Sequence, residues 1–182
     1  MKKLSKKEKT KINIMHAAKG QFESFGIDNV TISQIAEEAG VCRTTVFNHF
    51  SDIGELMLAI TSQEVCDVKE YCLESGYKGK DLAFRLFSKL IDDAALYPKL
   101  TAKLMTNAIL SQDENNPISL IEKIIIDGFK DDYDDEEAER LAILISGAYY
   151  GLINHYHINN KTFDGRIMKE EFEKLLSHII NE

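Results

Sequence analysis

The chain has 182 residues, with 22 Lys and Arg against 30 Asp and Glu, and therefore a formal net charge of −8 and a pI near 5.2. A domain that binds nucleic acid usually has a pI above ~9, so the average composition argues against this class. The charge is unevenly distributed, however. Residues 1–50 carry 8 basic and 5 acidic side chains, whereas residues 51–182 carry 14 and 25. This asymmetry predicts two functional parts, a mildly basic head and a strongly acidic body.

The remaining composition indicates an ordinary globular protein, with 44% hydrophobic and 29% charged residues. Only two prolines occur, so long stretches are free of helix breakers and the sequence predicts an all-α fold. No apolar run approaches the ~18 to 20 residues of a membrane span, and the N-terminus lacks the apolar core of a signal peptide. We therefore expect a soluble, cytoplasmic protein with no membrane partner.

The first predicted helix covers about residues 8–25. Apolar residues at steps of three and four form one stripe along it, consisting of Ile12, Met15, Ala18, Phe22 and Phe25. Gly26 follows the stripe directly and predicts the end of the helix.

The next two predicted helices are short and cover about residues 32–39 and 43–50. Thr31 is a good N-cap for the first of them, Gln34 completes a capping box, and Val30 with Ile35 occupies the positions of a hydrophobic staple. Gly40 is expected to end this helix in the left-handed conformation.

Two short helices joined by a turn with Gly, after a helix to pack against, have the sequence form of a helix-turn-helix. In the second short helix Val46 and Phe50 are expected to face inward. The side chains left partly or wholly on its outer surface are Arg43, Thr44, Thr45, Phe47 and Asn48.

Longer helices are expected from residue 52 onward. Asp52 and Glu55 give a capping-box-like start to a helix that reaches towards Cys72, and Gly76 and Gly79 then break the chain. Further helices are predicted at about 81–96, 99–111, 117–130, 135–157 and 164–181. The acidic run 131–137 precedes one of these helices, and its carboxylates suit the positive end of a helix dipole. We therefore interpret the run as a solvated helix start.

Residues 12–56 resemble the DNA-binding domain of the tetracycline-repressor (TetR) family. The matching residues are Ala17, Ala18, Phe22, Gly26, Thr31, Ile35, Ala36, Ala39, Gly40, Val41, Thr45, Phe47, His49, Phe50 and Leu56. The resemblance implies a helix-turn-helix DNA-binding domain at 1–52 and a helical ligand-binding and dimerisation domain at 53–182. It also implies a homodimeric transcriptional regulator, most simply a repressor that an unknown small-molecule effector releases from a palindromic operator on double-stranded DNA.

The resemblance also assigns roles to the helix at 43–50. Arg43, Thr44 and Asn48 match positions that approach base edges, and Thr45, Phe47 and His49 match positions that meet phosphate or base. An Arg fork suits the O6 and N7 atoms of guanine, and an Asn amide suits N6 and N7 of adenine.

Two further residues precede or open the helix at 32–39, where backbone N–H groups favour a phosphate. Ser33 is assigned to this contact. Thr31 either shares it or serves only as the cap.

The chain departs from the family pattern at three positions. Phe47 replaces the usual Tyr, Ile53 replaces the usual Lys, and Cys42 stands where Ser commonly caps the recognition helix. Six lysines crowd the N-terminus at positions 2, 3, 6, 7, 9 and 11. We hypothesise that these lysines form an arm that replaces the missing phosphate contacts, the alternative being a disordered solubilising tail.

The helices at 135–157 and 164–181 are implied by the resemblance to form a four-helix bundle with a second copy; an intramolecular core is the other use of their apolar faces. An effector cavity is expected among the central helices. Its candidate lining residues are Phe84, Phe87, Leu104, Met105, Asn107, Tyr149, Tyr150, Asn154 and His155, although such residues at helical spacing are often core.

No cofactor, metal site or catalytic residue is predicted. His155 and His157 are two residues apart and so point to different sides of a helix, and no phosphate-loop, dinucleotide-binding or Gly-x-Ser-x-Gly motif occurs. We expect a regulator and not an enzyme. A helix-turn-helix adaptor or DNA-organising protein without an inducer is the alternative function, and a small all-α enzyme is a more remote one.

Overall fold

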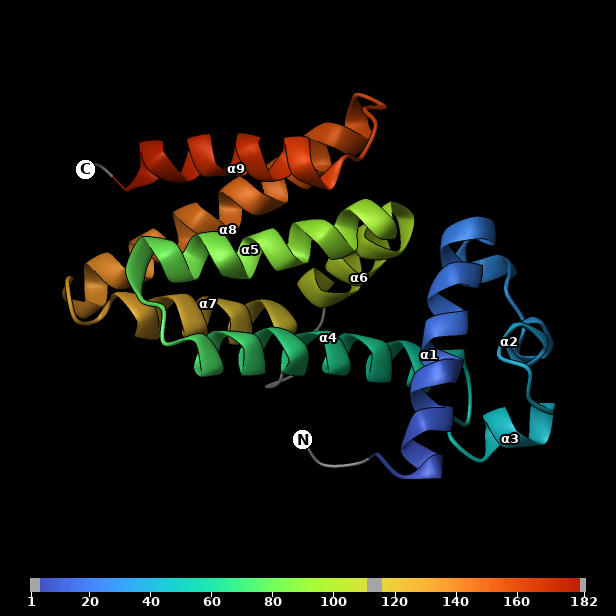
Figure 1. Ribbon diagram of the computed structural model, residues 1–182. Coiled ribbons are helices and arrows are strands. Elements are labelled where there is room, and N and C mark those ends of the chain that lie inside the picture. The colour runs from blue at the N-terminus through green and yellow to red at the C-terminus, as the bar shows by residue number, and fades with distance from the viewer. Residues whose placement is uncertain (1–3, 111–115, 181–182) are drawn as a thin grey trace. The chain divides into compact units, whose positions relative to one another are not determined.

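The computed structural model describes residues 4–110 and 116–180, and within these ranges the regular structure is entirely helical (Figure 1). The helices are α1 (Lys6–Phe25), α2 (Ile32–Glu38), α3 (Arg43–Phe47), α4 (Ile53–Ser75), α5 (Gly79–Leu96), α6 (Pro98–Leu110), α7 (Pro117–Phe129), α8 (Asp135–Ile158) and α9 (Gly165–Ile179). The predicted all-α fold is thereby confirmed. None of the described helices is long and apolar enough to cross a membrane.

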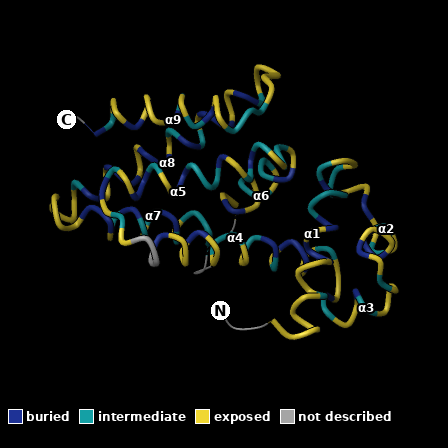
Figure 2. The backbone as a smooth tube through the Cα atoms, viewed as in Figure 1, coloured by how far each residue is buried: buried dark blue, intermediate teal, exposed yellow. Residues whose placement is uncertain are grey.

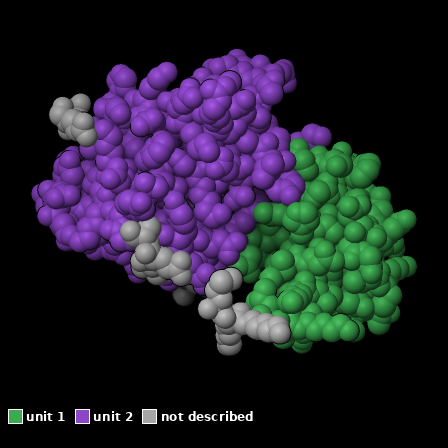
Figure 3. Space-filling model, viewed as in Figure 1, with its two compact units in different colours: residues 1–63 green, residues 64–182 purple. Residues whose placement is uncertain are grey.

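The chain forms two compact units, residues 1–63 and residues 64–182, which Figure 3 colours separately. Unit 1 has 8 basic and 7 acidic side chains, and unit 2 has 14 and 23, so the excess of negative charge belongs to unit 2. Helix α4 is continuous across residue 63 and contributes residues to both units. The domain boundary expected at residue 52 corresponds to the start of α4 and stays a prediction.

In α1, the buried face differs from the predicted stripe. Ile14, Ala18 and Phe22 repeat every four residues and are at most 1% exposed, whereas Ile12 is 43% and Phe25 is 55% exposed. Ile12 lies about 200° around the helix from Ile14, so the two residues cannot share one face. The prediction that Ile12 and Phe25 are buried is therefore wrong, while Met15, Ala18 and Phe22 are confirmed as core.

The start and end of α2 follow the predicted signals. The Thr31 side chain accepts from the Gln34 N–H, and the Gln34 side chain accepts from the Thr31 N–H at 2.8 Å. At the other end Gly40 has φ +64°, and the Val41 N–H donates to the Ala36 carbonyl at 2.9 Å. The capping box and the left-handed glycine are both confirmed, and together they fix the turn that leads into α3.

In unit 2, long helices surround one apolar core. Phe87 lies 5.1 Å from Tyr149 and 5.2 Å from Phe172 between ring centroids, which joins α5, α8 and α9. Helices α5 and α7 approach closely at Gly128, where a Cβ would overlap the Leu82 side chain. The alternation of buried and exposed positions along these helices is visible in Figure 2.

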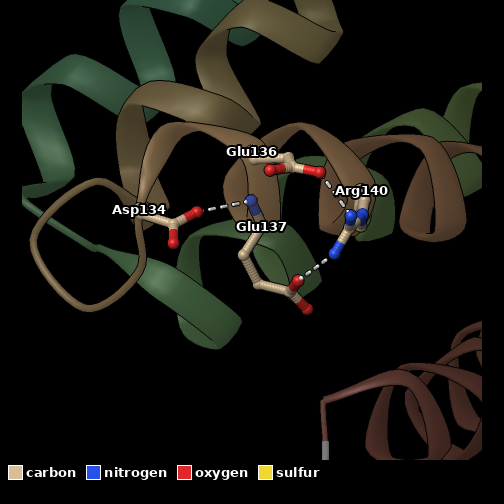
Figure 4. Close-up of polar contacts among 4 residues, drawn as sticks. All are labelled: Asp134, Glu136, Glu137 and Arg140. Atoms are coloured by element: carbon tan, nitrogen blue, oxygen red, sulfur yellow. Dashed lines mark hydrogen bonds and ion pairs between the residues drawn. The ribbon is translucent and has the colours of Figure 1, made fainter.

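The acidic run before α8 is a solvated helix start, as predicted. The Asp134 side chain accepts from the Glu137 N–H at 2.9 Å, and Arg140 forms ion pairs with Glu136 and Glu137 (Figure 4). Asp131 pairs with Lys78. The carboxylates of Asp134, Glu136 and Glu137 therefore cap the start of α8 or pair with Arg140, which explains this acidic run without a separate binding site.

Candidate nucleic-acid interface

Helix α3 presents one polar and aromatic face. Val46 is fully buried, and Thr45 and His49 are half-buried, so only a narrow side of this segment packs against the core of unit 1. The exposed side chains on the remaining surface are Arg43, Thr44, Phe47 and Asn48. At 100° per residue these four positions cover a continuous sector of about 140°.

The end of α3 falls earlier than expected. The helix ends at Phe47, with Asn48 as its C-cap in a right-handed helical conformation, whereas the apolar spacing predicts an end near residue 50. Phe50 is only 1% exposed although it lies beyond the helix. Burial of Phe50 is thus achieved by the turn after α3, which apolar spacing cannot distinguish from another helical turn.

The start of α3 lacks a conventional cap. Cys42 occupies the N-cap position, and its side chain makes no hydrogen bond to the helix backbone, as expected for a Cys at this position. Its Sγ lies instead 3.0 Å from Thr45 Oγ1. The hydrogen bond from Thr45 lowers the pKa of the Cys42 thiol. The Thr45 hydroxyl is therefore engaged within the motif.

Two roles were left open for Thr31, and the structure shows the capping role. Its hydroxyl donates to Gln34 Oε1 at 2.7 Å and accepts from the Gln34 N–H at 3.4 Å. Ser33, the second residue of α2, is exposed. Contact of either residue with a phosphate stays a prediction.

Helix α1 contacts the motif through two polar side chains, of which Asn13 was not singled out from the sequence and Lys11 was assigned only to the N-terminal arm. Asn13 Nδ2 donates to the Ala39 carbonyl at 2.7 Å, which satisfies an open carbonyl at the end of α2. Lys11 Nζ lies 5.7 Å from the centre of the Phe50 ring. The only sequence signal for this role of Asn13 was its position as a polar residue next to the apolar Ile14.

The N-terminal lysines do not form a free arm over their whole length. Ser5 caps α1 and shares a capping box with Glu8, so Lys6, Lys7, Lys9 and Lys11 belong to the helix. Lys2 and Lys3 lie outside the described residues. The idea of an arm is corrected accordingly, since most of this charge is carried by the exposed first turns of α1.

Unit 2 contains three hollows, which only two of the candidate effector residues line. Phe84 borders a 610 Å³ hollow between α5 and α9, and His155 borders a 520 Å³ groove between α8 and α9. Phe87 and Tyr149 are packed in the core, and Tyr150 contacts Tyr149 at 5.4 Å. The others are half-buried or exposed, namely Leu104, Met105, Asn107 and Asn154.

A third cavity was not predicted. It measures 350 Å³ and lies among α4, α5, α7 and the segment before α5. Its lining residues are Val65, Lys69, Cys72, Tyr77, Lys78, Leu82, Leu120, Lys123, Ile124, Asp127 and Gly128. Among the described residues no group of three or more His, Cys, Asp and Glu side chains is placed to hold a metal ion.

Comparison with known proteins supports the interpretation of unit 1. Residues 14–60 match the family model described as bacterial regulatory proteins, tetR family. Over 55 residues the chain is 34% identical to an uncharacterized helix-turn-helix transcriptional regulator of Mycobacterium tuberculosis H37Rv. That match covers 30% of this chain and 29% of the regulator.

Solved structures share the fold of nearly the whole chain. A transcriptional regulator of the TerR/AcrR family from Aquifex aeolicus is 19% identical, with a TM-score of 0.74 over 94% of this chain and 99% of that one. GusR of Salmonella enterica is 17% identical, with a TM-score of 0.72 over the full length of both chains. FadR of Bacillus subtilis, solved in complex with stearoyl-CoA, is 15% identical, with a TM-score of 0.64 over 93% and 99%. Residues 14–60 therefore carry the N-terminal domain described for bacterial regulatory proteins of the tetR family, and the chain as a whole has the fold of such regulators.

Proposed function

We propose that this protein is a homodimeric transcriptional regulator that binds a palindromic operator and is released from it by a small molecule. The observation that carries the proposal is the exposed face of α3, where Arg43, Thr44, Phe47 and Asn48 lie together on a helix of a capped helix-turn-helix. Arg and Asn are the side chains best suited to guanine and adenine edges in the major groove. A regulator of this kind acts where the chromosome lies, so the proposal includes a cytoplasmic location.

A second copy is part of the proposal because one helix of five residues reads too few base pairs for a specific site. The outer face of α8 offers a surface for that copy. Ile143 is 64% exposed, and Gly147 and Gly151 follow it at steps of four with open space beside them. On α9, Leu175 is 41% exposed and, like Gly151, lines the 520 Å³ groove between α8 and α9. The core side of α8 is a different face, which includes Leu141, Ile145, Leu152 and Tyr156.

The 350 Å³ cavity favours an effector-responsive regulator over an adaptor without an inducer. Its volume lies within the usual range for small-molecule sites, and its wall is largely apolar, with Lys69, Lys78, Lys123 and Asp127 as the charged lining residues. Helix α4 contributes Val65 and Cys72 to the cavity, and the first residues of the same helix, 53–63, belong to unit 1. A ligand that prefers one position of α4 would shift the population of DNA-binding states. The FadR structure with stearoyl-CoA supports a ligand-binding role for this fold.

The N-terminal lysines are proposed to supply non-specific attraction to phosphate, and unit 2, with its negative excess, to be held away from DNA. Substituting Gln at Lys6, Lys7 and Lys9 should weaken binding to all DNA sequences and reduce the slope of affinity against salt by about 0.9 per lost contact. This variant keeps the Ser5 cap, which deletion of residues 2–9 would remove. An unchanged salt slope would contradict the role of the lysines.

The function is tested by incubating the full-length chain with random genomic fragments and sequencing the DNA that it retains. The proposal predicts enrichment of one inverted-repeat sequence, with half-sites about one helical turn apart. Fragments retained without any shared sequence would favour the DNA-organising alternative. An enzyme is set aside in this proposal because the family model and the named neighbours describe regulators.

The effector site is tested separately with the dye 8-anilinonaphthalene-1-sulfonate, an apolar anion. Wild-type protein should bind the dye with enhanced fluorescence and release the selected DNA. Ile124→Trp places a larger side chain at the wall of the 350 Å³ cavity and should abolish both effects while leaving helical content unchanged. Equal dye binding by the variant would place the dye elsewhere and contradict the assignment of this cavity.

A further inference from the structure

The position of Phe47 on α3 is not explained by packing within unit 1. Val46 and Phe50 are at most 1% exposed and fasten this segment to the core, whereas Phe47 is 46% exposed. In the sector formed by residues 43, 44, 47 and 48, positions 44 and 47 fall at the centre and positions 43 and 48 at the edges. A large apolar ring therefore stands between the Arg and Asn side chains that the proposed function directs at bases.

The chemistry of the major groove limits what such a ring can contact there. Base edges in this groove present hydrogen-bond donors and acceptors, and their only apolar group is the 5-methyl group of thymine. A Phe ring has no donor or acceptor for the other groups. A ring held at the centre of the recognition face gains free energy from a thymine methyl group and loses hydration without return at other edges.

We propose that Phe47 determines specificity by contacting a thymine 5-methyl group in each half-site, between the bases read by Arg43 and Asn48. The inference rests on the proposed DNA-binding function and adds to it one base identity. Burying a methyl group contributes about 0.8 kcal/mol, which corresponds to about fourfold in affinity for one half-site and about fifteenfold for two.

The test replaces thymine by uracil in the DNA recovered by the full-length chain. Uracil lacks only the 5-methyl group, so pairing with adenine and the hydrogen-bonding edge are retained. Each thymine is replaced in turn, in both half-sites, and binding is measured by fluorescence anisotropy. One position should weaken wild-type binding by about fifteenfold, and Phe47→Ala should bind the thymine and uracil forms equally.

Two further variants keep the test specific. Phe47→Tyr retains the ring and should still discriminate thymine from uracil. Thr44→Ser removes the only other methyl group at the centre of the α3 face and should also leave the discrimination intact. Phe47 is 46% exposed, so its replacement should leave thermal unfolding unchanged.

Two results would overturn the inference while leaving the proposed function intact. In the first, every uracil-containing operator binds wild-type protein as tightly as the thymine form. In the second, the discrimination persists in Phe47→Ala or disappears in Thr44→Ser. If the chain selects no sequence at all, the proposed function and the role of Phe47 fail together.

Discussion

The two units of this protein are specified in different ways. In unit 1, α2 and α3 have only 7 and 5 residues; a capping box and a left-handed glycine fix the two ends of α2, and the same glycine turn leads into α3. In unit 2 the helices have 13 to 24 residues, and packing of large apolar side chains holds them. Explicit end signals leave few ways to orient a short helix, so the sequence indicates which of its residues are exposed. For a packed core, the sequence indicates that apolar residues are buried together but not which of them contact one another.

The largest expected effects come from the two cores. Phe22 in unit 1 and Phe172 in unit 2 are at most 1% exposed, so replacing either by Ala should lower the free energy of unfolding by about 3 to 5 kcal/mol. Urea unfolding measures both. Phe22→Ala should abolish DNA binding while the protein still self-associates, and Phe172→Ala should weaken self-association. Loss of self-association in Phe22→Ala would mean that the units do not act separately.

A smaller effect is expected at the outer face of α8. Ile143→Glu should weaken self-association by about a hundredfold or more, because a dimer would bury an unpaired carboxylate. Ile109→Glu is the matched control, since Ile109 is 66% exposed on α6. Analytical ultracentrifugation measures both variants. Dissociation by the Ile109 variant alone would place the dimer surface on α6.

The helix ends of unit 1 should each change stability by about 1 kcal/mol. Thr31→Ala removes the cap of α2 and should lower the free energy of unfolding. Cys42→Ser supplies the missing cap of α3 and should raise it by a similar amount. Cys66→Ser, at an exposed position in α4, is the control and should change nothing. If Cys42→Ser is destabilising, the contact between Cys42 and Thr45 matters more than a cap.

The smallest effect concerns alkaline pH and unit 2. Burial raises the pKa of Tyr149 and Tyr150, and burial together with the hydrogen bond to Glu171 raises the pKa of Tyr156 to about 12. Because the folded protein holds these protons more tightly, their stabilising contribution is present below pH ~10 and is lost as pH rises towards 12.

Absorbance of phenolate can follow this loss, because the chain has seven tyrosines and no tryptophan. Tyr149, Tyr150 and Tyr156 should ionise only together with unfolding. Tyr156→Phe should reduce the fall in stability above pH 10. Titration of all seven tyrosines in folded protein below pH 10.5 would contradict the burial of these hydroxyls.

The sequence was most informative where a single residue type has one structural use. Thr31, Gln34 and Gly40 each met a specific need of the backbone, and all three were placed correctly. Periodicity was less reliable at helix ends, where Phe25 lies beyond the core and Phe50 is buried by a turn. The exposed face of α3 was predicted from local signals together with the family resemblance.

The effector region could not be inferred in the same way. Aromatic residues such as Phe87 and Tyr149 are as useful in a core as in a ligand site, and the structure packs them against each other. The 350 Å³ cavity depends on the spacing between α4, α5 and α7, which Gly128 and Leu82 help to set. The spacing between two helices depends on how their side chains pack together, so it leaves no periodic pattern in the sequence of either helix.

The central claim is that the exposed face of α3 reads DNA sequence. It is tested most directly by the ratio of affinities for the selected operator and for a scrambled duplex, measured at one salt concentration. Wild-type protein should show a ratio of about 10³ or more, and Arg43→Ala combined with Asn48→Ala should lower it to about 15 or less, the share assigned to Phe47, with self-association unchanged. A double variant that keeps the wild-type ratio would contradict the claim.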